Sequence, residues 1–593
     1  MSRSKTNNSS ITSKRSVEKL YYPSESHFFR FFVPKFQRRA PLINRGYHLR
    51  LRVIDVLVRD FILSESNRKK VVVNLGCGSD VLPWQCWERY PAATGDGVRF
   101  VDVDFPELMV RKRGVVLATP ELSGVLSGVK DHEGLAAPVV LESDQYVQIA
   151  CDLRELGTLQ KGLETVLGDM NECEFLFVAE VSITYMETDG ANGVIRWASG
   201  LGKGEFVMVA PNGRVGKDDA NGEMEAEFVL LEQILPEGPK HPFAETMLNH
   251  FEKLNSQLKS VHTYPTLSSQ LERFSSRGWG SVRALTLWQA WSDDEFFTTE
   301  DRQKLEEIDP FDEWEEFALF GSHYCLIHAR TEKGEVRVVG YSGVGEYETH
   351  GNPTPDISLV VQHDECSGQR GQRRFAAAMV LSEKSDSNQS NQSIIVNTLG
   401  LGTKGRLQSC DVFHHGSHDA AVGMSFGDGG PASRMCHSLT HLGEGHGSLL
   451  SGGRAAPFNP FQDCWLFDKT TKIWNRTHDL PIPLYRHSAT SLTGGLALLA
   501  GGRTSKGAAF EEFLLYEPKI GWIACEVVGE VKPTPVYGAA LAARDTDVSS
   551  SGKRRGVYIG GLRNGTIVDQ ILSWELDITD RKVSSEGICR TVE

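Results

Sequence analysis

The stretch "VVVNLGCGSD", residues 71–80, combines the pattern of a buried strand with a glycine loop. Apolar and β-branched residues that run into Gly76 and Gly78 are typical of a parallel strand whose end holds a cofactor. The same letters also fit a buried strand with an ordinary turn. The choice between these two interpretations depends on the residues at the ends of the other strands of the same region.

An alternation of strand-like apolar runs and amphipathic stretches extends from residue 14 to about residue 333. Continuous apolar strands separated by helices indicate a doubly wound α/β fold, whose parallel sheet is covered on both faces. We expect helices over "GTLQKGLETVLGDM" and "PFAETMLNHFEKLNSQL". The expected strands are 70–76, 98–105, 146–152, 173–180, 227–233 and 322–329.

Polar residues stand at the ends of successive expected strands. Asp104 ends the second strand 28 residues after Gly76, where a carboxylate can accept both hydroxyls of a ribose. Asp152 and Leu153 follow the third strand and suit the amino group and the face of an adenine, and Glu180 ends the fourth strand. In a doubly wound sheet these strand ends meet at the switch in strand order, so the pattern favours one shared ligand.

The glycine loop lacks both GxGxxG and the Lys-Ser/Thr of a phosphate-binding loop, so we do not expect it to cradle phosphates. A ligand with ribose and adenine but without phosphate groups points to S-adenosyl-L-methionine. The predicted fold of the first region is therefore the class I S-adenosylmethionine-dependent methyltransferase fold.

Several motifs of this region resemble the leucine carboxyl methyltransferase family over about residues 13–333. They are "SKRSVEKLYY" (13–22), "PLINRGYHLR" (41–50), "NLGCGSD" (74–80), "VDVDFPEL" (101–108), "CDLREL" (151–156), "AEVSITYM" (179–186) and "DEWEEFALFGSHYCLIHA" (312–329). The resemblance implies that Lys14 and Arg45 meet the methionine carboxylate of the cofactor and that Glu180 lies near its amine. It also implies Gly76 beneath the methionine part, Asp104 at the ribose, and Asp152 with Leu153 at the adenine.

A methyl-accepting carboxylate has a pKa near 4, so it is ionised at neutral pH and requires no strong general base. Arg154 and Tyr185 follow the third and fourth strand ends, and we expect them to hold the substrate carboxylate. The alternative is a surface arginine and a core tyrosine.

The sequence pattern changes after a polar, glycine-rich stretch. The apolar strands "LLSGGR" (449–454), "LLAGGR" (498–503) and "VYIGGLR" (557–563) end in Gly pairs spaced by 49 and 59 residues, and "VNTLGLG" (396–402) is a weaker copy. A period near 50 with Gly-Gly and aromatic residues resembles the kelch repeat and predicts an all-β propeller. About four blades are visible, so we expect an incomplete propeller or degenerate first blades.

These patterns divide the chain into a methyltransferase domain at 1–335, with disorder expected at 1–13, a linker at 336–372, and a kelch propeller at 373–593. The segment 203–226 precedes the expected fifth strand and contains its own strand-like run, "EFVMVA". We assign the fifth strand to 227–233 and interpret 203–226 as an insertion or a gene-model artefact.

A methyltransferase of this family joined to kelch repeats is similar to the tRNA-modifying enzymes of wybutosine biosynthesis. The resemblance implies tRNA(Phe) as the partner and methylation of the α-carboxylate of the modified guanosine side chain next to the anticodon. It also implies methoxycarbonylation of the side chain's α-amine with CO2 or bicarbonate. The alternatives are a methyltransferase for the C-terminal leucine of a phosphatase catalytic subunit, and a non-catalytic kelch scaffold that contacts proteins.

The net charge of −14 hides a basic N-terminal region, because residues 1–113 contain 21 Lys/Arg and 11 Asp/Glu, a local charge of +10. A basic region on an acidic protein is typical of an anion-binding face and favours RNA. Eleven cysteines without a CxxC pair indicate reduced thiols. "HHGSH" (414–418) has no flanking acids, so we expect no metal site there.

No apolar run is long enough to span a membrane and no secretory signal is recognisable, so we expect no membrane association and a cytoplasmic location. The first residues, rich in Arg, Lys and Ser, bear a faint similarity to a mitochondrial transit peptide.

Overall fold

The computed structural model describes residues 2–338 and 373–587, apart from 96, 132–133, 202–224, 310, 312, 333, 385–390, 403–404, 415–421, 426–428, 444, 457–458, 530 and 545–551. The chain divides into two compact units, Met1–His350 and Gly351–Glu593. Residues 336–338, the start of the expected linker, form a strand of the first unit. The rest of that linker and nearly all of segment 203–226 lie outside the described residues.

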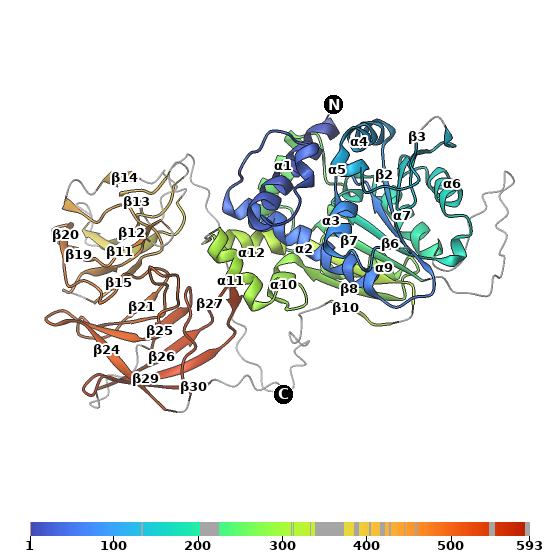
Figure 1. The fold of residues 1–593 in the computed structure, drawn as a ribbon. Coiled ribbons are helices and arrows are strands. Elements are labelled where there is room, and N and C mark those ends of the chain that lie inside the picture. The colour runs from blue at the N-terminus through green and yellow to red at the C-terminus, as the bar shows by residue number, and fades with distance from the viewer. Residues whose placement is uncertain are drawn as a thin grey trace. The chain divides into compact units, whose positions relative to one another are not determined.

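The first unit is built on a ten-stranded sheet with the order β10-β8-β9-β7-β6-β1-β2-β5-β4-β3 (Figure 1). Strand β1 (Lys69–Leu75) lies at the switch in strand order and pairs in parallel with β2 (Val98–Asp104) and β6 (Cys173–Glu180). β5 (Tyr146–Ala150) and β7 (Ala226–Gln233) continue the parallel part on either side. The other strands are β3 (Lys130–Asp131), β4 (Val139–Glu142), β8 (Ser281–Thr286), β9 (Tyr324–Arg330) and β10 (Val336–Val338).

The six strands expected from the sequence are confirmed to within two residues, and so is the doubly wound α/β fold. β7 begins at Ala226, which confirms the assignment of the fifth strand to 227–233. The antiparallel strand β8 has no counterpart among the expected strands, because its six residues "SVRALT" alternate polar and apolar types without a long apolar run.

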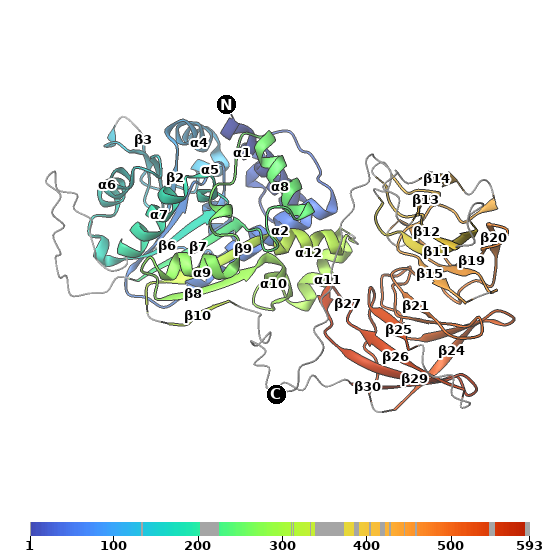
Figure 2. The same ribbon diagram turned by 180° about the vertical axis from the view of Figure 1, so that it is seen from behind.

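Helices cover both faces of the sheet (Figure 2). α6 (Leu156–Leu167), α7 (Thr188–Leu201) and α9 (Leu267–Ser275) share one hydrophobic cluster with the strands. α2 (Pro41–Leu63) contacts β6 and β7. The remaining helices are α3 (Leu82–Arg89), α4 (Pro106–Ala118), α5 (Pro120–Ser123), α8 (Pro242–Lys253), α10 (Leu287–Ser292), α11 (Thr299–Ile308) and α12 (Trp314–Ser322), with short 3-10 turns η1 (Phe28–Phe31), η3 (Met170–Glu172), η4 (Ile183–Tyr185) and η5 (Ser260–His262).

The N-terminal segment corrects one expectation. The sequence predicts disorder at 1–13, but Ser2–Tyr21 form helix α1, which contacts α2, η1 and α11. The helix buries Ile11 and Val17, and the carboxylate of Glu18 accepts a hydrogen bond from the backbone N–H of Phe28 at 2.8 Å. Its polar composition hides it in the sequence, because tertiary packing rather than a strong apolar stripe stabilises it.

In the described part of the second unit, the strands form four antiparallel groups of four. Their second strands are β12 (Asn391–Thr398), β16 (Ser448–Ser451), β22 (Ala497–Ala500) and β26 (Lys553–Ile559), which are the glycine-ended strands of the repeats. The other strands are β11 (Ala377–Lys384), β13 (Ser409–His414), β14 (Val422–Ser425), β15 (Ser438–His441), β19 (Cys464–Asp468), β20 (Ile473–Arg476), β21 (Ser488–Ser491), β23 (Phe513–Glu517), β24 (Gly521–Val528), β25 (Ala540–Ala543), β29 (Ile571–Asp577) and β30 (Lys582–Gly587), with hairpins β17 (Arg454–Ala456)–β18 (Asn459–Pro460) and β27 (Leu562–Arg563)–β28 (Thr566–Ile567).

The last two groups differ from separate propeller blades. β24 pairs in parallel with β30, which joins these groups into one sheet of eight strands. The spacing of the repeats agrees with the strands, because the Gly pairs follow β16, β22 and β26 directly.

The glycine pairs allow neighbouring groups of strands to approach closely. A Cβ at Gly452 would lie 2.3 Å from the carbonyl oxygen of Leu484, and one at Gly501 would lie 2.5 Å from that of Val536. Both glycines also have positive φ, 56° and 64°. Each contacted carbonyl belongs to the segment that leads into the next group, so the repeated Gly marks the contact between groups.

None of the helices in the described ranges is both long and apolar enough to cross a membrane.

The close approach at Gly501 can be tested against a matched glycine. Gly494 has a positive φ of 81°, but a Cβ at this position would meet no atom within 4 Å, so Gly494→Ala carries only the backbone cost. That cost is about 1–3 kcal/mol. We expect Gly501→Ala to lower the melting temperature of the full chain clearly more than Gly494→Ala, because it adds the clash with Val536. Equal shifts in differential scanning calorimetry would contradict the packing role.

Helix α1 gives a pH-dependent prediction. Burial raises the pKa of Glu18 from 4.5 to about 8, although hydrogen bonds from Phe28 and Phe29 oppose the shift. The folded state therefore binds a proton that the unfolded state releases, and stability falls as pH rises from about 4.5 to about 8. We expect Glu18→Gln to melt higher than the wild type at pH 8, by about 2–4 °C for each kcal/mol gained, and at nearly the same temperature at pH 4.5. A difference in melting temperature between the variant and the wild type that does not change with pH would contradict the raised pKa of Glu18.

Candidate functional site

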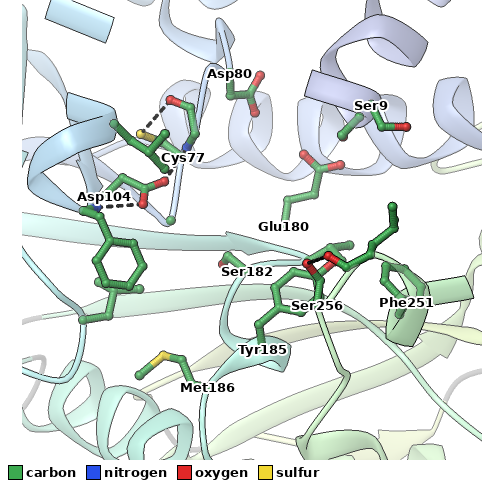
Figure 3. Close-up of a pocket in the computed structure, with 18 of the residues that line it drawn as sticks. Ser9, Cys77, Asp80, Asp104, Glu180, Ser182, Tyr185, Met186, Phe251 and Ser256 are labelled. Carbon is green, nitrogen blue, oxygen red and sulfur yellow. Dashed lines mark hydrogen bonds between the residues drawn. The ribbon is translucent and has the colours of Figure 1, made fainter. Parts of the chain in front are cut away.

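A cavity of about 730 Å³ opens at the carboxyl ends of β1, β2, β5 and β6 (Figure 3). Ser9 of α1 lies on one side, and Phe251 of α8 and Ser256 lie on another. The cavity is lined by every predicted site residue except Arg45, namely Lys14, Gly76, Gly78, Asp104, Asp152, Leu153, Arg154, Glu180 and Tyr185.

The ends of β1 and β6 touch at Gly76. A Cβ there would lie 2.6 Å from the Cβ of Ser182, and the φ of Gly76 is 74°. The hydroxyl of Ser182 donates a hydrogen bond of 2.6 Å to the carbonyl oxygen of Leu75. Only glycine fits this position without displacing the end of β6, and this contact brings the glycine loop close to Glu180.

Lys112 fixes the other end of the glycine loop. The buried Nζ of Lys112 on α4 donates to the carbonyl oxygen of Asp80 at 2.6 Å and lies 2.7 Å from the carboxylate of Asp102. Burial alone would lower the pKa of Lys112, but the carboxylate of Asp102 raises it, so the ammonium stays charged. Burial raises the pKa of the Cys77 thiol well above its ordinary value, so Cys77 is a packing residue rather than a nucleophile.

Asp104 is held for hydrogen bonding by backbone groups. The N–H of Gly78 donates to one carboxylate oxygen and the N–H of Phe105 to the other, both at 2.7 Å (Figure 3). Burial raises the pKa of Asp104, and the two hydrogen bonds oppose this shift. Each oxygen keeps a further lone pair, so the carboxylate can accept the two hydroxyls of a ribose.

Glu180 joins three elements of the site. Lys14 of α1 donates to its Oε2 at 2.6 Å, and Arg50 of α2 contacts its Oε1 at 3.0 and 3.2 Å. Lys14 also lies 3.1 Å from Asp80. Burial alone would raise the pKa of Glu180, but Lys14 and Arg50 outweigh it and lower the pKa to about 2. Two cations beside two carboxylates match the ammonium and carboxylate of a free amino acid group.

Arg45 lies outside this cavity. Its guanidinium is fully buried, donates to the carbonyl oxygens of Leu305 at 3.1 Å and Asp309 at 3.0 Å, and lies 3.5 Å from Glu306. Arg45 therefore anchors α2 to the end of α11. Arg50, five residues later and so about 140° around the same helix, supplies the guanidinium that faces the cavity.

Arg154 and Tyr185 occupy different depths. The side chain of Arg154 is 62% exposed, and its Nε lies 2.9 and 3.0 Å from the two carboxylate oxygens of Asp152. Arg154 thus lies at the mouth of the cavity. It forms an ion pair with Asp152, the residue whose carboxylate is expected to contact the adenine. Tyr185 lies inside, with its ring centre 6.1 Å from that of Phe251. Burial raises the pKa of Tyr185, so its hydroxyl stays protonated.

The sequence analysis missed Arg50 and the aromatic residues around it. The guanidinium lies 4.6 Å from the ring centre of Tyr47 and 5.7 Å from that of Tyr324, and both rings line the cavity. Tyr47 and Arg50 belong to the motif "NRGYHLR", so helical spacing applied to that motif would have separated its buried face from its cavity face.

Among the residues that the structure describes, no group of three or more His, Cys, Asp or Glu side chains could hold a metal ion. Residues 415–418 of the "HHGSH" motif lie outside that part of the chain.

Comparison with known proteins places two matches on the chain. Residues 8–199 match the family described as Leucine carboxyl methyltransferase, which confirms the resemblance of the first unit. Residues 431–591 match the family described as tRNA wybutosine-synthesizing protein 4, beta-propeller.

Several relatives are named tRNA wybutosine-synthesizing protein 4. The chain is 49% identical to tRNA wybutosine-synthesizing protein 4 of Neurospora crassa, over 97% of this chain and 53% of that protein. It is 45% identical to the protein of that name from Gibberella zeae, over 97% and 53%. For Saccharomyces cerevisiae the identity is 31%, over 96% of this chain and 79% of that protein. The chain spans about half the length of the first two relatives.

The two arginines of α2 give opposite predictions. We expect Arg45→Met to lower the melting temperature, because it removes the anchor to α11, while the remaining folded protein still binds S-adenosylmethionine. We expect Arg50→Met to weaken that binding about 10- to 100-fold, the value of a hydrogen bond to a charged group. Calorimetric titration and thermal melting of both variants check this. Weakened cofactor binding in Arg45→Met alone would restore the role expected from the sequence.

Proposed function

Because the chain belongs to the tRNA wybutosine-synthesizing protein 4 family, we propose that its first unit is an S-adenosylmethionine-dependent carboxyl methyltransferase that modifies tRNA. The proposed methyl acceptor is the α-carboxylate of the modified guanosine side chain next to the anticodon of tRNA(Phe). The observation that carries the proposal is the single cavity lined by Gly76, Asp104 and Glu180 together with Arg50 and Tyr185.

The cofactor would supply a methyl group bound to a positively charged sulfur. The charged cluster of Lys14, Arg50, Asp80 and Glu180 would hold its amino acid end, because that cluster offers cations to the carboxylate and acids to the ammonium. Asp104 would accept the ribose hydroxyls. Asp152 and Leu153 remain the candidates for the adenine, once Arg154 shares or releases Asp152.

The proposed reaction needs little acid–base catalysis. A substrate carboxylate is already ionised at neutral pH, so no general base is needed. Catalysis would come from holding the carboxylate oxygen in line with the methyl group and excluding water. Tyr185 can donate its hydroxyl hydrogen to that carboxylate without the strong charge pairing that would weaken the nucleophile. Arg154 would attract the anionic substrate at the mouth rather than hold it at depth, and its exposed side chain supports that part of the proposal.

The second expected step, methoxycarbonylation of the α-amine with CO2 or bicarbonate, is part of the same proposal. It is supported by the family alone. Its measurement is incorporation of labelled bicarbonate into the methylated tRNA.

The competing function is methylation of the C-terminal leucine of a phosphatase catalytic subunit, since the cofactor side of the cavity would serve both reactions. The wybutosine-specific propeller match over residues 431–591 favours tRNA.

A methyl-transfer assay separates the two substrates. We expect labelled S-adenosylmethionine to transfer its methyl group to tRNA(Phe) from cells lacking this enzyme, and not to the phosphatase subunit. Tyr185→Phe should lower kcat/KM about 10- to 100-fold, because it removes one hydrogen bond to a charged group, and should leave cofactor affinity unchanged. Label on the phosphatase alone would reverse the assignment.

A further inference from the structure

Two sets of positive charges stand out within residues 1–113 in the structure. One set lies inside the protein and cannot reach a macromolecular partner. Its members are buried or nearly so and form ion pairs with buried acids: Lys14, Arg45, Arg50, Arg89 and Lys112. The partners of Arg45 and Arg50, Glu306 and Glu180, lie outside residues 1–113, so the +10 excess counted in the sequence overstates the charge that this region presents to a macromolecule.

The second set gathers on α1, on η1 and on the segment between η1 and α2. We call it the basic rim, and its members are Arg15, Lys19, Arg30, Lys35, Arg38 and Arg39. Lys19, Arg30, Lys35 and Arg38 are exposed, and Arg15 and Arg39 are half-buried.

Acidic residues neutralise this rim only weakly. Glu18 is buried and bonded to backbone N–H groups, and Glu25 is occupied by Arg89 at 2.7 Å. From outside the segment, Glu121 lies 3.5 Å from Arg30, with both side chains about half exposed. An exposed pair of this kind contributes about 0–1 kcal/mol, so a phosphate can displace it.

Asp309 lies 3.1 Å from Arg38, but it is 3% exposed and also accepts hydrogen bonds from Tyr21 and Asn44. Its charge is therefore shared within the protein, and the 60% exposed side chain of Arg38 adds to the positive surface.

Aromatic rings lie between the cations. The Nζ of Lys19 lies 4.3 Å from the ring centre of Phe36, and the guanidinium of Arg30 lies 4.7 Å from that of Phe31. Both rings are half-buried. Cations interleaved with aromatic rings suit single-stranded RNA, whose phosphates pair with the cations and whose bases stack on the rings. An acidic protein surface would use the cations but not the rings.

The basic rim continues to the mouth of the cavity. The Nη2 of Arg39 lies 3.5 Å from the carbonyl oxygen of Ser9, which lines the cavity (Figure 3). Ser10 lines the cavity too. The backbone N–H of Arg39 donates to the hydroxyl of Ser16 at 3.0 Å, which fixes the segment against α1.

We propose that the basic rim binds the phosphates of the RNA strand whose modified base enters the cavity. This inference rests on the proposed function, since it requires an RNA substrate. It assigns the docking surface to α1 and residues 28–40 of the first unit, next to the mouth.

The test compares two triple variants of the full chain. Lys19→Gln, Arg30→Gln and Lys35→Gln remove three charges from the rim. Lys69→Gln, Lys130→Gln and Lys161→Gln remove three exposed charges elsewhere; Lys69 and Lys130 have acidic neighbours at 3.6 and 3.5 Å, much like Arg30. The binding of an anticodon stem-loop RNA is measured over a range of salt concentrations, with cofactor affinity by calorimetry as the check of folding.

We expect the rim variant to bind the RNA about 10- to 100-fold more weakly at low salt, with a salt slope smaller by about 2–3. The control variant should match the wild type, and all three proteins should bind S-adenosylmethionine equally. RNA affinity and salt slope unchanged in the rim variant, while the wild type methylates tRNA, would overturn the docking surface and leave the proposed function standing. A rim variant that loses binding to the phosphatase subunit instead of RNA would overturn both the docking surface and the proposed function. A wild type that neither binds nor methylates tRNA would also overturn both.

Discussion

The site depends on the two ion pairs that Glu180 forms, one through each carboxylate oxygen. Its two oxygens hold Lys14 of α1 and Arg50 of α2, so the end of one strand fixes two helices over the cavity. Burying such charges costs free energy that the pairing only partly offsets. The arrangement at the end of β6 therefore adds little stability, which fits the proposed role of the cluster in exchanging partners with a polar ligand.

The glycine loop complements that cluster by geometry rather than by charge. Gly76 brings the end of β1 against Ser182 at the end of β6, and Lys112 fixes the carbonyl of Asp80 on the other side. Asp104 is oriented by two backbone N–H groups of the same region. The loop is therefore shaped before any ligand binds, which reduces the conformational entropy that binding must remove.

Much of this could be predicted from the sequence, and the failures have identifiable causes. Continuous apolar runs mark the parallel strands, and the polar residues at their ends mark the cavity, because topology brings those ends together. The expected place of Arg45 is wrong because a motif gives residue order but not the side of the helix that each residue faces. Arg50, in the same motif, is missed for the same reason. Helix α1 has no clear signal because its stability comes from burying Ile11 and Val17 against elements distant in sequence. The parallel pairing of β24 with β30 has no signal in the repeat, whose spacing describes each group of strands by itself.

Helix α1 contributes Lys14 to the charged cluster, and this has a thermodynamic consequence for the N-terminal segment. Docking of the helix and occupation of the cavity use the same carboxylates, so the two equilibria are linked and each must change the other by an equal factor. The supply of methyl donor would then bear on how firmly the first twenty residues are seated, and any change to that segment would be felt as altered affinity for the donor.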